Sequence, residues 1–386
     1  MDLIMQRRRT SALLYVISAA LSATPPVSRM PADSIYSLAV KHSLGAITAH
    51  GLEMAGAAPA AASADKLQAI RRAMLFDSAR GEILSIFDKE KIKYINLKGI
   101  VIKDLYPSIG LREMSDNDIL ISRSDRRRVR AIMKRLGYSV ESYGKGHHDT
   151  YIKEPIFNFE IHVSLFSYNR ERFGEYFSNI MDKCSARGEC ERVMSDEDFY
   201  LFLKAHEYKH YTSGGIGLRA LVDTYVFLRA KSSTLDFEYV ERECAALGIS
   251  SYERESRLLS MKLFDPAFSD SLLACAKDGV MLDLTDSEWN MLDYISSSGT
   301  YGNVANEIDN AMQEYEESGE GSGAKMRFLI RRVFPPMSFY KENAPVVYKF
   351  KILIPFYCFG RLVKAVFTNT DRVFAQLKNL IRYKKK

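Results

Sequence analysis

The hydrophobic pattern of this chain of 386 residues changes period twice, and these changes restrict the folds that it can adopt. Apolar residues recur at helical spacing over residues 10–90, with breaks at Pro25-Pro26 and in the Ala-rich stretch 55–64. Short strand-like runs follow between residues 94 and 165, and helical patterns return after Ser195. We therefore predict an α+β fold, in which an α/β core with a mixed sheet is flanked by extensive N- and C-terminal helices.

The order of elements in the predicted core follows from the same pattern. A long amphipathic helix at 67–90 precedes a strand at 94–97 and a short helix that ends before Tyr106-Pro107, because the residue before proline resists the helical region. The remaining predicted elements are a strand that begins near Asp116, a basic helix at 126–136 and strands at 138–143, 149–153 and 157–165.

We expect three regions within one compact unit. They are an N-terminal helical region at 1–90, the core at 91–190 and a C-terminal helical region with a basic tail at 191–386. The stretch 306–320 has six acidic residues and no basic one, and Gly321-Ser322-Gly323 follows it. This stretch is the predicted linker.

Charge is distributed unevenly along the chain. Residues 321–386 contain fifteen Lys or Arg against two acids, Glu342 and Asp371, although the net charge of the whole chain is only +6. A basic tail of this kind either binds an acidic partner, such as nucleic acid or a lipid surface, or forms a solvated face that balances an acidic body.

The amino terminus and the cysteines indicate in which cellular compartment the protein is expected. Arg7-Arg8-Arg9 and the apolar run after it resemble a signal peptide, but the helical spacing of Leu13, Leu14, Ile17 and Leu21 favours an amphipathic docking helix. The five cysteines are scattered and lack CxxC spacing, which argues against a disulfide framework or a thiolate zinc site. We expect a cytoplasmic protein without a transmembrane segment.

Two aspartates one residue apart open the predicted strand near residue 116. In a strand, Asp116 and Asp118 point to one face about 6–7 Å apart, a spacing that suits a divalent metal with oxygen ligands. The other interpretation is a turn, where Asp, Asn and Ser gather because they hydrogen-bond nearby backbone. Glu160 lies within the apolar strand 157–162, where a carboxylate is costly unless it is paired or binds a cation. It is the natural third ligand.

Several short motifs, in chain order, resemble those of a bacterial family of uncharacterised nucleotidyltransferases. They match the family pattern LKG, YP, G-x-R, D-x-D-hydrophobic and E-hydrophobic-H at Leu97-Lys98-Gly99, Tyr106-Pro107, Gly110 and Arg112, Asp116 to Ile119, and Glu160-Ile161-His162. The resemblance continues through His206, Arg219 and Asp223 to Phe334-Pro335-Pro336. It implies a nucleotidyltransferase-fold core and covers most of residues 10–370.

The resemblance also implies an activity. Asp116 and Asp118 match the family's paired metal ligands, and Glu160 matches its third acid, which either ligates a metal or acts as the base. Two Mg²⁺ ions would then assist transfer of a nucleoside monophosphate from an NTP, such as ATP, to an unidentified acceptor.

Three further residues are expected at the nucleotide. Lys98 and Gly99 form the turn that approaches the triphosphate in this fold, where a lysine suits the β- and γ-phosphates. Arg112 either binds phosphate or holds Asp116 or Glu160 in place.

The histidines and the helical segment after residue 195 leave alternatives open. His147, His148 and His162 either line the pocket or pack in the core, and Arg219 and Asp223 are spaced for a helical salt bridge or a role in closing the site.

His206-Glu207-Tyr208-Lys209-His210 matches the H-E-x-x-H pattern of zinc proteases, although no third ligand is evident at a recognised spacing. A rival from another class is a catalytically silent module that binds nucleic acid or acidic surfaces through the basic tail.

Overall fold

The strands form one seven-stranded mixed sheet, which packs against helices on both faces. The computed structural model describes residues 3–27, 30–167, 170–317, 323–368 and 370–383, and its strand order is β3-β4-β5-β2-β1-β7-β6. The strands are β1 (Tyr94–Asn96), β2 (Asn117–Ile121), β3 (Ser139–Ser142), β4 (His148–Lys153), β5 (Phe157–His162), β6 (Ser185–Arg187) and β7 (Glu191–Val193). β2 runs parallel to β5 and antiparallel to β1, so the predicted mixed sheet is confirmed.

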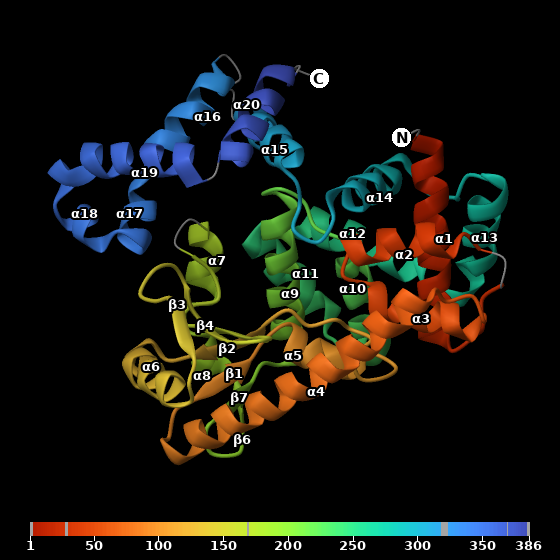
Figure 1. The fold of residues 1–386 in the computed structure, drawn as a ribbon, viewed down its shortest axis with the longest axis horizontal. Helices are drawn as coiled ribbons and strands as arrows, with labels where there is room; N and C mark the ends of the chain where they lie inside the picture. The colour runs from red at the N-terminus through yellow and green to blue at the C-terminus, as the bar shows by residue number, and fades with distance from the viewer. Residues whose placement is uncertain (1–2, 28–29, 168–169, 318–322, 369, 384–386) are drawn as a thin grey trace.

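Helices surround this sheet, as Figure 1 shows. Those before the sheet are α1 (Leu3–Ser22), α2 (Ala32–Lys41), α3 (Gly45–Met54) and α4 (Ala60–Lys89). Those between strands are α5 (Gly99–Ile102), α6 (Arg126–Arg135), α7 (Glu171–Tyr176) and α8 (Ile180–Lys183). Those that follow are α9 (Asp196–Tyr211), α10 (Arg219–Lys231), α11 (Phe237–Leu247), α12 (Ser250–Leu263), α13 (Ser269–Asp278), α14 (Asp286–Ser298), α15 (Val304–Glu317), α16 (Ala324–Val333), α17 (Met337–Asn343), α18 (Pro345–Lys349), α19 (Ile354–Thr368) and α20 (Thr370–Arg382).

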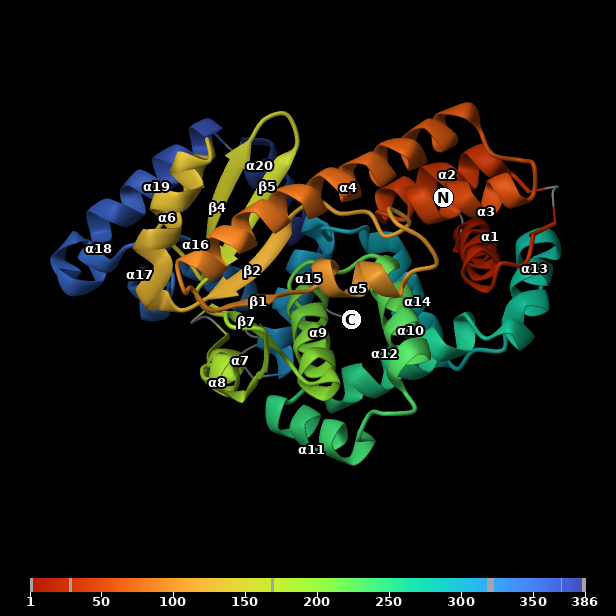
Figure 2. The same cartoon turned by 90° about the horizontal axis from the view of Figure 1, so that it is seen from below.

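The two faces of the sheet pack against different helices. Ile119 and Ile121 of β2 join a hydrophobic cluster with Phe76 of α4 and with residues of α6. Leu120, between them, joins a second cluster that contains Phe202 of α9 and residues of α10. Alternate residues of β2 therefore pack into separate hydrophobic cores, because successive side chains of a strand point to opposite faces of the sheet. In Figure 2, α4 crosses one side of the strands while α9 and α10 lie on the other.

The N-terminal helices share a core with the helices that follow the sheet. Residues 10–21 of α1 are buried, and Leu14 and Ile17 lie in the same hydrophobic cluster as Val226 of α10 and Ile295 of α14. This part of α1 is buried on all sides, with Thr10, Ser11 and Ser18 enclosed among its apolar residues, whereas the sequence predicted an amphipathic helix with one exposed side. α1 packs along α13, and the two helices lie side by side in Figures 1 and 2.

The C-terminal helices have a small core of their own, and the predicted linker at 306–320 is wrong over most of its length. Residues up to Glu317 belong to α15, because Ile308, Met312 and Tyr315 recur at helical spacing and pack against Phe328 of α16. The predicted acidic stretch from 318 to 320 lies outside the described residues. Acidic composition therefore reflects the solvated side of this helix and not a flexible connection.

Two other secondary-structure elements differ from the predictions. α4 begins at Ala60, inside the predicted break at 55–64, because alanine is the strongest helix former and Pro59 lies just outside the helix, at its N-cap. The β6–β7 hairpin was not predicted, since its strands have three residues each and no apolar alternation.

One bent pair of helical segments, Lys351–Ala365 with Thr370–Arg382, meets the length and composition expected of a membrane span. Among the described residues, no single helix does.

Leu14→Ala should lower the free energy of unfolding by about 2–5 kcal/mol, because it leaves a cavity in the cluster that joins the N-terminal helices to the rest. Equilibrium urea denaturation followed by circular dichroism measures the effect. Leu67→Ala is the control, since Leu67 is exposed on α4 and its truncation should cost less than about 0.5 kcal/mol. Equal small losses for both variants would contradict the burial of α1.

Candidate functional site

The register of neighbouring strands brings the predicted acids together with two histidines. Asp118 of β2 is opposite Glu160 of β5, and Leu120 is opposite His162. On the other side of β5, His148 of β4 is opposite His162. Residues two apart in a strand, and residues directly opposite each other, point to the same face. Two acids and two imidazoles therefore share the face of the sheet that α9 and α10 cover.

Asp118 is the most enclosed acid of this group, and one of its oxygens has two partners. Lys98 donates from Nζ to Oδ1 of Asp118 at 2.8 Å, and Nε2 of His162 lies 2.7 Å from the same oxygen. Burial opposes ionisation of Asp118, but Lys98 and His162 outweigh it and hold the pKa of Asp118 well below its usual range. Burial also acts to lower the pKa of Lys98, yet Asp118 and Asp116 raise it overall. Asp118 and Lys98 are therefore both charged at neutral pH.

Asp116 lies in the opposite electrostatic situation. Burial and the neighbouring charge of Asp118 raise the pKa of Asp116 to about 6, with a further contribution from Glu160. Among the described residues, Asp116 makes no ion pair of its own. Three acids thus crowd together with Lys98 as their adjacent cation, and one of them holds its proton more tightly than a solvated aspartate does.

Glu160 is the acid that solvent reaches most easily. Its Oε2 lies 3.9 Å from Nε2 of His148 and 3.7 Å from Nε2 of His162. Burial acts to raise the pKa of Glu160, but the neighbouring His162, His148 and Lys98 lower it overall. Glu160 is therefore ionised and partly open to an incoming group.

The turn after β1 is strained at Lys98. Its backbone φ is +43° and ψ is −117°, a conformation that residues with a side chain rarely adopt. The amide of Leu97 donates to the carbonyl of Asp118 at 3.0 Å, which fixes the start of the turn to β2. Gly99 follows, and a Cβ at that position would collide with the guanidinium of Arg112 and the sulfur of Met114. A side chain at 99 would have to displace Arg112 or Met114, so this internal contact favours glycine independently of any phosphate.

That guanidinium belongs to a buried ion pair. Nε and Nη2 of Arg112 donate to the two carboxylate oxygens of Asp223 at 2.9 and 2.8 Å, and the hydroxyl of Tyr106 donates to the same carboxylate at 2.7 Å. All three side chains are buried. Burial acts to lower the pKa of Arg112, but Asp223 raises it overall, so the pair is ionised.

This pair changes two expectations. The side-chain hydrogen bonds of Arg112 go to Asp223 and Met114, and not to Asp116 or Glu160 as one sequence interpretation held. The expected helical salt bridge between Arg219 and Asp223 is also wrong among the described residues, because Arg112 occupies both oxygens of Asp223. A role for Arg112 in binding phosphate stays a prediction.

Three histidines form a second group beside the acids. His147, His148 and His162 offer nitrogen atoms that all lie within 4.8 Å of one another. Nδ1 of His148 and Nδ1 of the buried His162 have no hydrogen-bond partner among the described residues. Burial, together with the two neighbouring imidazoles, lowers the pKa of His147 to about 2, so this ring is neutral. Glu342 of α17 approaches from the other side, with Oε1 3.9 Å from Nδ1 of His147.

The donor set at the centre fits a divalent cation. Asp118, Glu160 and His162 each offer one atom, and these atoms lie within 4.8 Å of one another. Carboxylate oxygens suit Mg²⁺, and an imidazole nitrogen beside them also suits Mn²⁺. The unpartnered Nδ1 of the buried His162 adds a further polar atom to the same group. Asp118, Glu160 and His162, with Asp116 beside them, could hold a metal ion here.

The helix α9 covers this face with further basic groups. His206 and His210 stand one turn apart, with their Nε2 atoms 3.3 Å from each other, and burial lowers the pKa of both. Burial, with Lys98 and Arg170, lowers the pKa of Lys209 to about 8. The sequence did not single out Lys209, because its place at the site depends on how α9 crosses the sheet.

The protease interpretation of α9 fails on the position of Glu207. Its carboxylate accepts a hydrogen bond from Nζ of Lys204 at 2.8 Å, and both side chains are buried. Thr224 and Ser256 bind the same buried network. A protease needs this glutamate beside a metal-bound water, so its internal pairing rules out that mechanism.

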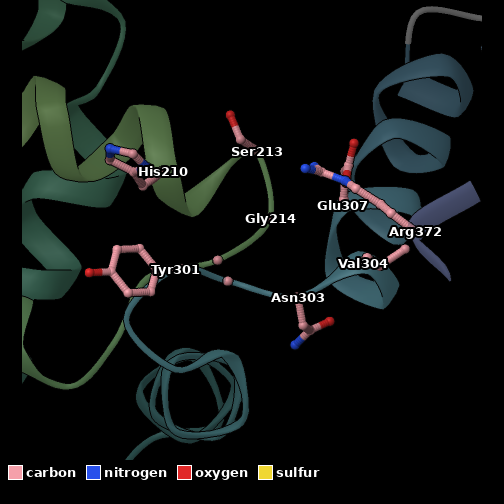
Figure 3. A pocket seen from close by; sticks show the side chains of 10 residues that line it. His210, Ser213, Gly214, Tyr301, Asn303, Val304, Glu307 and Arg372 are labelled. Atoms are coloured by element: carbon pink, nitrogen blue, oxygen red, sulfur yellow. The ribbon is translucent and has the colours of Figure 1, made fainter. Parts of the chain in front are cut away.

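A separate polar cavity of about 420 Å³ lies beyond His210. It is lined by the end of α9, the Gly214-Gly215 turn, the segment from Tyr301 to Val304, and Glu307 and Arg372. Figure 3 shows His210 and Tyr301 across the cavity from Glu307 and Arg372. None of the acids on β2 or β5 lines it, so the cavity is distinct from the candidate metal site.

Comparison with known proteins gives one result. A family model described as "Uncharacterised nucleotidyltransferase" matches residues 28–265, which contain the sheet, the acids and the Arg112–Asp223 pair. No curated protein and no solved structure matches the chain.

Asp116→Asn and Asp118→Asn should change the stability of the metal-free protein in opposite directions at pH 8. The pKa of Asp116 is raised from 3.8 to about 6, so ionised Asp116 destabilises the fold, and Asn should stabilise it by about 1–3 kcal/mol. This gain should fade as the pH falls through 6 and be absent below 3.8.

The pKa of Asp118 is instead lowered, so ionised Asp118 stabilises the fold above pH 3.8, and Asn leaves Lys98 without its carboxylate. Thermal unfolding in EDTA at pH 8 and at pH 4 measures both variants. Shifts of the same sign at pH 8 would contradict the electrostatic arrangement described above.

Proposed function

Because the chain belongs to the family of uncharacterised nucleotidyltransferases, we propose that it transfers a nucleoside monophosphate from an NTP to an acceptor hydroxyl or phosphate, in a Mg²⁺-dependent reaction. The observation that carries this proposal is the register of β2 and β5, which places Asp118 opposite Glu160 with Lys98 bonded to Asp118. That arrangement combines the oxygen donors for a cation with a positive group for the phosphates of the nucleotide.

Asp116, Asp118 and Glu160 are the proposed metal ligands. The crowding of their charges supports the assignment, since burial and the charge of Asp118 raise the pKa of Asp116, and a divalent cation would offset both effects. When bound, Mg²⁺ offsets the charge of the α-phosphate and lowers the pKa of the acceptor hydroxyl. The partly open position of Glu160 allows either of two roles, as a third ligand or as the base that takes the hydroxyl proton.

Lys98 is the proposed phosphate-binding residue. In the transfer, the acceptor oxygen bonds to the α-phosphorus, the bond from that phosphorus to the bridging oxygen of the β-phosphate breaks, and pyrophosphate leaves. The ammonium of Lys98 would stabilise the negative charge that develops on the pyrophosphate. Its strained backbone supports a functional role, because a lysine in this conformation costs about 1–3 kcal/mol that another residue there, such as glycine, would avoid.

Asp116→Ala and Asp118→Ala should each reduce nucleotidyl transfer at least about a hundredfold, because each removes a proposed metal ligand. The purified full chain is incubated with each labelled NTP and a panel of hydroxyl and phosphate acceptors, and labelled product and pyrophosphate are measured together. Glu141→Ala is the matched control, since Glu141 is an exposed acid on β3 of the same sheet. Full activity in both aspartate variants would refute the metal assignment.

Lys98→Met should raise the KM for the NTP about tenfold or more, because it removes the charge proposed to bind the β- and γ-phosphates. The exposed Lys93→Met provides the control for loss of a nearby lysine. Steady-state kinetics at saturating Mg²⁺ separates KM from kcat. An unchanged KM in Lys98→Met would place the phosphates elsewhere.

A catalytically silent module would behave differently in a binding experiment. It would bind nucleic acid with an affinity that falls steeply with salt, and Asp116→Ala would leave that affinity unchanged. The proposed enzyme should instead bind Mg²⁺-NTP in calorimetry, and Asp116→Ala should abolish the binding.

A further inference from the structure

A continuous apolar stripe is exposed along the C-terminal helices. It begins in the short 3₁₀ turn Lys351–Leu353 and continues along α19 at intervals of three and four residues. This spacing places the side chains on one side of a helix. Its members are Ile352, Phe356, Phe359, Val363 and Phe367, whose exposed fractions are 79%, 75%, 70%, 41% and 81%.

The next helix adds a second exposed stripe. On α20, Phe374, Leu377 and Ile381 recur at the same helical spacing, with exposed fractions of 66%, 40% and 78%. Large apolar side chains scattered singly on a surface are ordinary, but aligned sets of this kind mark a surface that contacts an apolar partner. We call these eight residues of α19, α20 and the preceding turn the apolar face.

Cations flank the apolar face, and one of them, Arg372, forms an ion pair with Glu307 of α15. Exposed basic residues near it in the chain are Lys349, Lys351, Lys364, Arg372, Lys378 and Arg382. Of the two acids in residues 321–386, Glu342 is buried and Asp371 is exposed. Aromatic and aliphatic side chains with surrounding Lys and Arg are the composition of helices that lie in a membrane interface and attract anionic lipid.

The charge also argues against a second copy of the chain as the partner. Two copies that met through this face would bring together two regions in which basic residues outnumber acids, so their charges would oppose association. Anionic lipid headgroups supply the missing negative charge, and the acyl region beneath them accepts the phenylalanines.

The geometry fits a segment that lies on a membrane and does not cross it. The two helical segments Lys351–Ala365 and Thr370–Arg382 meet at a bend of 97°, and neither alone is long and apolar enough for a span. Lys351 and Lys364 lie within the first segment and are exposed. A membrane span would have to bury both in the hydrocarbon region. Partial insertion of the apolar face lets these lysines reach the headgroups.

We propose that the apolar face docks the protein on an anionic membrane surface, with its phenylalanines inserted among the acyl chains and the neighbouring lysines and arginines at the headgroups. This proposal does not depend on the nucleotidyltransferase activity, since it rests on the C-terminal helices alone.

Sedimentation with liposomes tests the proposal on the full chain. The protein should bind vesicles of phosphatidylcholine with one quarter phosphatidylglycerol at least about tenfold more tightly than vesicles of phosphatidylcholine alone, and raised salt should weaken the binding. Equal binding to both vesicles, or binding to neither, would overturn the proposal.

Substitutions in the apolar face test whether it is responsible for binding to the vesicles. The triple variant Phe356→Ser, Phe359→Ser and Phe367→Ser should lose at least about tenfold in affinity for the anionic vesicles, and its circular dichroism should stay unchanged because all three side chains are exposed. Leu67→Ser with Met74→Ser, two exposed apolar residues on α4, is the matched control and should bind like the native chain.

Two further outcomes would also overturn the proposal. One is a dimer in sedimentation velocity without lipid that the triple variant abolishes, since the face would then join two copies. The other is tight binding of single-stranded RNA that the triple variant abolishes while vesicle binding persists.

Discussion

The buried ion pair between Arg112 and Asp223 fixes the candidate site to the helical part of the molecule. The two residues are 111 positions apart in the chain, and the pair joins the loop before β2 to α10. Gly99 lies against the same guanidinium, so the pair also constrains the turn that carries Lys98. Removing one partner would leave a buried charge uncompensated, which typically costs about 3–5 kcal/mol. The position of both Lys98 and β2 therefore depends on a contact outside the sheet.

In contrast to the matched pair of Arg112 and Asp223, the charges on the sheet are only partly balanced. Lys98 and His162 share one oxygen of Asp118, whereas Asp116 has no ion pair among the described residues. Among the described residues, Lys98 is the one lysine or arginine that forms an ion pair with these acids, although Lys209 and Arg219 also act on them electrostatically. Ionised Asp116 and the strained backbone of Lys98 both cost stability, and such costs persist where the surrounding structure enforces them for a function.

The sequence was sufficient for features that depend on local pattern. An acid within an apolar strand marked Glu160, which the register then placed opposite Asp118. The predicted strand contains Asp118 but not Asp116, because β2 begins at Asn117 and Asp116 lies just before it. The predicted linker at 306–320 was also wrong for a local reason. Acidic composition suggested a linker, although Ile308 and Met312 recur at helical spacing and pack in a core. Both signals were in the sequence, and the apolar period was the more reliable of the two.

Partners that are distant in the chain could not be predicted in this way. The spacing of Arg219 and Asp223 on one helix suggested a local salt bridge, but a bidentate guanidinium from another element competes better for a buried carboxylate. Glu207 shows the same effect, because the H-E-x-x-H pattern says nothing of the buried Lys204 that binds this acid. Local motifs name residues that are able to do chemistry, and only the packing decides which of them are already engaged.

The C-terminal helices connect the proposed membrane face to the border of the site. Glu342 of α17 lies against His147, while the apolar face on α19 and α20 is exposed on the same C-terminal region. If lipid binding shifted α17, the environment of His147 would change, and ligand binding at the site would alter lipid affinity by the same factor, because such coupling is reciprocal. The contact between His147 and Glu342, at 3.9 Å, is one route for that coupling, and the hydrogen bond from Asn310 of α15 to the carbonyl of Tyr211 in α9 is another.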